Sequence, residues 1–79
     1  MATNDGGSES IARLGSKQFL DMTANQHNGH NHAWLIAELD RLARGETTKR
    51  EIFKAMGITA PILDKYIFII NLERAQNGN

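Results

Sequence analysis

Three histidines lie in or next to the polar segment 25–31, and they are the residues best suited to metal chemistry: His27, His30 and His32. Spacings of three and two residues could bring their imidazoles around a transition metal, for which histidine is a common ligand. No cysteine or nearby carboxylate completes a ligand set, and ordering a flexible Asn-Gly loop around an ion would be costly. The sequence therefore favours a solvated turn whose last residues cap the next helix, and it predicts no cofactor.

No other residues form a pattern typical of catalysis. The chain has no cysteine, no pairing of a nucleophile with a base, no Gly-rich phosphate loop and no two carboxylates spaced for acid–base work. A chain of 79 residues also leaves little room for a cleft that excludes water. We therefore expect neither an enzyme nor a small-molecule substrate.

Composition indicates one small domain. Hydrophobic residues make up 41% of the 79, which is enough for a limited core. No apolar run is long enough to cross a bilayer, and the first ten residues, MATNDGGSES, lack the pattern of a secretory signal. The absence of cysteine fits a reducing cytoplasm, so we expect a cytoplasmic protein with no membrane partner. Nine Lys and Arg balance nine Asp and Glu, and this neutrality does not favour nucleic-acid binding.

The N-terminal half shows weak helical signals and then one strong one. Residues 1–8 are small and polar and predict a disordered tail before a single helical domain at 9–76. In residues 9–24, an irregular apolar pattern interrupted by Gly15 predicts a turn and then a helix near 17–24, with Ser16 as its cap. Residues 32–44 carry a broad apolar face that Gly45 ends, so they predict a helix.

Two closely spaced helical patterns make up the C-terminal part. Thr48 is followed three residues later by Glu51, a capping box that predicts a helix start. Gly57 can adopt the left-handed conformation that ends a helix. Thr59 and Pro61 then suit the cap and the first turn of a second helix.

Five residues in this part follow one another in a recognisable order: Ile52, Gly57, Ile58, Leu63 and Tyr66. Over residues 47–74 they resemble the helix-turn-helix unit of small phage, plasmid and bacterial repressors. The expected fold is all-α, a small bundle of four to five helices with the unit at 48–74. One departure is Phe53, where the family pattern usually has alanine. Such a ring predicts helices pushed apart or a side chain turned outward.

The resemblance implies duplex DNA as a partner, with the first helix on phosphates and the second helix on bases. The phosphate candidates are Thr48, Lys49, Arg50 and Lys54. The base candidates are Thr59, Ala60, Pro61, Asp64 and Lys65. None of the latter is an Arg, Asn or Gln, the types that pair best with bases. Residues 47–74 hold five cations and three carboxylates, a mild basic bias.

The last helix carries more apolar surface than one core needs, and this surplus predicts an interface. The candidates are Ile62, Phe68, Ile69 and Leu72. Either the N-terminal helix or a second chain could cover them, and a homodimer and another protein both remain open. Residues 66–70 are also rich in β-forming types, so a strand is an alternative there, although the continuation LERAQ favours a helix.

Two functions are therefore open. The first is a small, dimeric, DNA-binding transcriptional regulator. The alternative is a small protein-binding inhibitor or adaptor, such as a phage-type binder of a host factor, built on the same scaffold without DNA binding.

Overall fold

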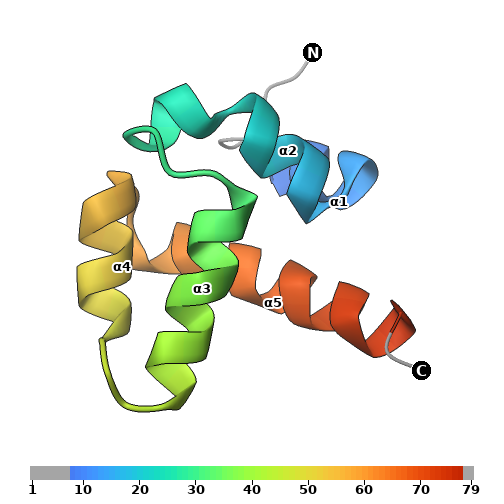
Figure 1. Cartoon of the computed structure of the whole chain (residues 1–79). Coiled ribbons are helices and arrows are strands. Elements are labelled where there is room, and N and C mark those ends of the chain that lie inside the picture. The colour runs from blue at the N-terminus through green and yellow to red at the C-terminus, as the bar shows by residue number, and fades with distance from the viewer. Residues whose placement is uncertain (1–7, 78–79) are drawn as a thin grey trace.

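The structure is a computed structural model and describes residues 8–77 of the chain. Over that range the regular secondary structure is entirely helical, with turns and short loops between the helices (Figure 1). They are α1 (Ser8–Leu14), α2 (Ser16–Met22), the 3-10 helix η1 (Ala24–His27), α3 (His32–Ala43), α4 (Lys49–Met56) and α5 (Ala60–Asn77). The predicted all-α bundle of four to five helices is confirmed.

Helix α5 is the element on which most of the others pack. It contacts α4 near its start and α1 and α2 further along, while α3 lies against α2 and α4 (Figure 1). The buried core draws on every α-helix: Ile11, Phe19, Leu20, Leu35, Ile52, Met56, Leu63, Tyr66 and Ile70. The N-terminal helices therefore provide intramolecular cover for one side of α5, which is one of the two alternatives that its apolar surplus left open.

The N-terminal region differs from the prediction. The segment expected to be a turn is helix α1, and α2 ends at Met22, short of the expected residue 24. Gly15, with φ 91°, occupies the N-cap position, and Ser16 is instead the first residue of α2. The predicted tail at 1–8 lies outside the described residues except for Ser8, which begins α1.

A carboxylate from the other end of the chain explains why Ser16 is not the cap. Glu73 of α5 accepts a hydrogen bond from the Ser16 backbone N–H at 2.8 Å and another from its hydroxyl at 2.5 Å. This satisfies a free N–H at the start of α2 and places a negative charge near the positive end of that helix. A contact between residues 57 positions apart leaves no local trace in the sequence.

The expected polar loop at 25–31 is more ordered than predicted. It continues from η1 into a turn at Asn28, a left-handed residue with φ 58°. The Asn28 side-chain amide donates to the Ala55 carbonyl of α4 at 2.8 Å. Asn31 then caps α3 by accepting from the Trp34 N–H at 3.0 Å, as the predicted capping role of this segment requires.

The later helices follow the prediction closely. Helix α3 ends at Ala43, just before Gly45, whose φ is 75°. Residues 66–70 lie inside the 18-residue α5, so the strand alternative is wrong. Within residues 8–77 no single helix has both the length and the apolarity to cross a bilayer, although α4 and α5 taken together across their bend meet those criteria on length and composition.

Candidate nucleic-acid interface

Helix α4 begins as predicted, directly after Thr48. The Thr48 hydroxyl accepts a hydrogen bond from the Glu51 N–H at 3.2 Å. The reciprocal bond of a full capping box, from the Thr48 N–H to the Glu51 carboxylate, is not made among the described residues. Thr48, a phosphate candidate, therefore already uses one acceptor position of its hydroxyl to start the helix.

Burial on one side of α4 sets the direction of its cations. Ile52 and Met56 are fully buried, which fixes the inner face of the helix. Arg50 and Lys54 are exposed on the outer face and, four residues apart, lie side by side. In the part of the chain that the structure describes, neither makes an ion pair. Both can therefore reach an external anion without first giving up a partner.

Unlike Arg50 and Lys54, the Lys and Arg residues of α2, of α3 and directly after α3 form ion pairs within residues 8–77. Their ion pairs are Lys17 with Asp21, Arg41 with Glu38, Arg41 with Glu46 and Arg44 with Glu46. The Lys17 contact, together with the His32 backbone N–H, holds the pKa of Asp21 below its usual value. Positive charge that is locally compensated contributes little to attracting a polyanion. Unpaired positive charge within residues 8–77 is therefore found at Arg50 and Lys54 of α4 and at the more distant Arg13 and Arg74.

The turn between α4 and α5 has the geometry that the glycine predicts. Gly57 is left-handed, with φ 73°, and its N–H donates to the Lys54 carbonyl at 3.2 Å. The Ile58 N–H donates to the Phe53 carbonyl at 3.1 Å, which completes a Schellman-type helix end. The chain direction changes by 102° between the two helices, within the range of helix-turn-helix units.

The unusual Phe53 does not prevent this turn. Its ring is half-buried and packs against the core next to the buried residues of α4. Of the two outcomes considered for this ring, an outward orientation is wrong. The bend and the three-residue turn are retained with the ring partly buried against the core.

The start of α5 is open to solvent. Ala60, Pro61, Asp64 and Lys65 are all exposed, whereas Leu63 and Tyr66 are buried on the opposite side of the helix. The Thr59 carbonyl accepts from the Leu63 N–H at 3.0 Å, but the predicted side-chain cap is not formed, since the hydroxyl makes no hydrogen bond within residues 8–77. The base candidates thus share one accessible surface at the end of α5 nearest α4.

One ion pair crosses from α4 to α5 on this surface. The Lys49 ammonium lies 3.0 Å from the Asp64 carboxylate, and both side chains are more than half exposed. A phosphate candidate and a base candidate therefore neutralise each other. Lys49 differs in this respect from Arg50 and Lys54.

Tyr66 lies on the buried side of α5, opposite this surface, and contacts the N-terminal region. Its hydroxyl lies 3.1 Å from His27 Nε2, and the rings of Phe19, His27 and Tyr66 pack edge to face. His27 Nδ1 lies 3.0 Å from the Thr23 carbonyl, which can only accept, so Nδ1 carries the proton and Nε2 accepts from Tyr66. Burial lowers the pKa of His27 and raises that of Tyr66, and both shifts favour the neutral forms.

The three histidines do not converge. His27 is buried, contrary to the expected solvated turn, because Tyr66 and Thr23 satisfy both ring nitrogens. The His30 ring stacks on Trp34 with centroids 3.9 Å apart, and His32 opens α3. Over residues 8–77, no group of three or more His, Cys, Asp or Glu side chains is placed to hold a metal ion.

The interface candidates of α5 separate into two kinds. Ile62 and Ile69 are half-buried and pack against the core. Phe68 and Leu72 are 65% and 47% exposed and lie four residues apart on one face. An apolar contact with another molecule could therefore use Phe68 and Leu72 without disturbing the core.

Sequence reasoning missed that Phe68 and Asn71 share the exposed face of α5 with the base candidates. Phe68 follows Asp64 by four residues, so it lies on the same side of the helix as the base candidates, and not only on an apolar interface. Asn71, which is exposed, follows three residues later and carries the amide type that pairs well with adenine. Helical spacing counted from Asp64 would have found both.

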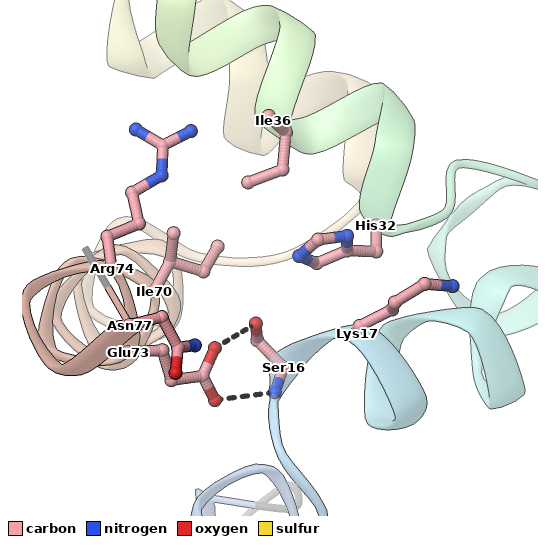
Figure 2. A pocket seen from close by; sticks show the side chains of 8 residues that line it. All are labelled: Ser16, Lys17, His32, Ile36, Ile70, Glu73, Arg74 and Asn77. Carbon is pink, nitrogen blue, oxygen red and sulfur yellow. Dashed lines mark hydrogen bonds between the residues drawn. The ribbon is translucent and has the colours of Figure 1, made fainter. Parts of the chain in front are cut away.

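A cleft of about 350 Å³ lies between α2, α3 and α5 (Figure 2). The His32 ring points into it, Ile36 and Ile70 give it apolar surface, and the Glu73 carboxylate bonded to Ser16 forms one side. Because both Glu73 oxygens are engaged, we interpret the cleft as the joint where α2 docks on α5. None of the DNA candidates lines it.

Comparison of the chain with protein-family models, curated proteins and solved structures finds no match. Its function is therefore argued from its own residues.

Proposed function

We propose that the protein is a small cytoplasmic DNA-binding regulator that uses α4, the turn and the start of α5 as a helix-turn-helix. The observation that carries the proposal is that Arg50 and Lys54 are exposed, form no ion pair within residues 8–77, and lie on the helix that leads through the turn into the exposed start of α5. The outer face of α4 supplies two cations without ion-pair partners within that range for phosphates, next to one exposed carboxylate, Glu51. The exposed start of α5 is a helix, and the major groove is wide enough to admit one. A two-fold dimer would place two such units on successive half-sites.

The chemistry of α5 favours modest sequence discrimination. Ala60 and Phe68 offer apolar contact to thymine methyl groups, and Lys65 can donate to guanine. No arginine stands on this face, so most of the affinity would come from phosphate contacts. The protein should therefore bind many duplexes with similar, strongly salt-dependent affinity.

The test is equilibrium binding to a mixed-sequence duplex over a series of salt concentrations. Arg50→Ala/Lys54→Ala should weaken binding and reduce the slope of log K against log salt by roughly 1.8, about 0.9 for each lost phosphate contact. The matched control is Arg13→Ala/Arg74→Ala, which removes the same charge from α1 and the far end of α5, at two exposed cations that also form no ion pair within residues 8–77. No binding at low salt, or equal losses in the two double variants, would contradict the proposal.

A second candidate function, docking on another protein, is favoured by the exposure of Phe68 and Leu72. It predicts a partner that survives nuclease treatment of the host lysate and is lost with Phe68→Asp. Phe68 is a sharper site for this test than Ile69, because Ile69 packs on the core and a charge there would also disturb folding. A partner removed by nuclease would point back to DNA.

A further inference from the structure

The ion pair between Lys49 and Asp64 occupies the surface that DNA would use. Lys49 is the first residue of α4, Asp64 lies in the second turn of α5, and the two charged atoms are 3.0 Å apart. The contact joins the two helices across their bend. It is an ion pair between side chains that lie 15 positions apart in the sequence.

A carboxylate and a phosphate oxygen offer an ammonium group the same kind of charged acceptor. Lys49 cannot give its full charge to a phosphate while it neutralises Asp64, and an uncompensated Asp64 would repel the DNA backbone. Arg50 and Lys54 form no ion pair within residues 8–77 and so carry no such restraint.

Resting on the proposed function, we infer that Asp64 restrains DNA binding by holding Lys49 in the place of a phosphate. DNA must displace this carboxylate before Lys49 can contribute. Removing the charge of Asp64 should then free one phosphate contact. The salt dependence should steepen by about 0.9 in the slope of log K against log salt.

The expected gain in affinity is moderate, because an exposed ion pair is a weak competitor. Asp64→Asn should raise the affinity for duplex DNA roughly two- to five-fold at low salt, in keeping with the strength of exposed pairs. The gain should shrink as salt rises, because exposed charges are increasingly screened. The side chain is 58% exposed, so the substitution should leave the fold intact, as far-UV circular dichroism would show.

The experiment is a double-mutant cycle with a charge-matched control. Wild type, Asp64→Asn, Lys49→Met and the double variant are titrated with a fluorescent mixed-sequence duplex at several salt concentrations. The control is Glu51→Gln, which removes an equal charge from an exposed α4 residue that forms no ion pair within residues 8–77. It measures the effect of lowering long-range repulsion alone.

Three results are possible. A gain in Asp64→Asn that exceeds the gain in Glu51→Gln and disappears in the Lys49→Met background supports the inference. A gain equal to the control, or one that persists without Lys49, overturns it and leaves the proposed function standing. If no variant binds duplex DNA even at low salt, both the inference and the proposed function are wrong.

Discussion

The two ends of this molecule are stabilised in different ways. From α3 to α5, each helix is long enough to carry an apolar face, and Thr48, Gly57 and Asn31 end or begin helices through contacts with near neighbours. From α1 to η1 the helices have only four to seven residues. Helices that short are not stable alone in water, and the same holds for the eight-residue α4, which differs from them in having local cap contacts at both of its ends.

The N-terminal helices are instead held by contacts with distant parts of the chain. Ser16 bonds to Glu73, His27 to Tyr66, and Asn28 to Ala55. The comparison shows that local sequence signals specify α4 and α5, whereas α1, α2 and η1 depend on tertiary contacts with α4 and α5.

The largest effect should come from the core that both regions share. Leu63→Ala removes a fully buried side chain of α5 and should lower the free energy of unfolding by about 2–5 kcal/mol, measured by urea denaturation. The control Phe68→Ala changes an exposed residue and should alter it by no more than about 0.5 kcal/mol. Equal losses would mean that α5 is buried on a different side.

Glu73→Ala should affect the two regions differently. It leaves the buried N–H and hydroxyl of Ser16 without their acceptor, at a cost of about 1–3 kcal/mol. Amide hydrogen exchange should speed up most in α2 and least in α4. Gln76→Ala, at an exposed α5 position, is the control. Unchanged protection of α2 would show that this helix does not depend on the distant carboxylate.

Acid should weaken the contact between His27 of η1 and Tyr66 of α5. The loss of stability should be smaller than that of Glu73→Ala, because the hydrogen bond to Thr23 partly offsets the effect of burial on the pKa of His27. That pKa is lowered in the folded state, so the unfolded chain binds the proton more tightly. The resulting stability is complete above the unfolded pKa of about 6.5 and is lost as pH falls through it toward the folded value.

His32 has its pKa lowered by burial too, and it contributes with the same sign. Urea denaturation of His27→Gln and His32→Gln from neutral to mildly acidic pH separates the two histidines. The loss of stability below about pH 6.5 should diminish in each variant, and His27→Gln should also weaken the contact with Tyr66. An unchanged profile in His27→Gln would contradict the neutral, buried assignment of this ring.

The smallest and most local effect is expected at the start of α4. Thr48→Ala removes the cap on the Glu51 N–H and should cost about 1 kcal/mol. Thr59→Ala is the matched control, because that hydroxyl makes no hydrogen bond within residues 8–77, and it should be nearly neutral. Comparable losses at the two threonines would show that the hydroxyl bond is not what stabilises α4.

These differences also explain what could be predicted from the sequence. The apolar spacing of residues 32–44, the cap at Thr48 and the turn at Gly57 are local signals, and they place α3, α4 and α5 within a few residues. Ser16 and His27 were misjudged because their partners, Glu73 and Tyr66, lie 57 and 39 positions away.

The candidate interface was predictable only in part. Helical spacing identifies the exposed cations of α4 and the outer face of α5. The pairing of Lys49 with Asp64 depends on the 102° bend between their helices, which no local pattern specifies.

The most direct test of the central claim is to follow the backbone amide signals of the protein by NMR while duplex DNA is added. DNA binding through α4 and the start of α5 predicts shifts concentrated at residues 48–54 and 59–65, with smaller changes in α1 and α2. Shifts centred on Lys17, His32 and Arg74 around the cleft, or no shifts at low salt, would contradict it.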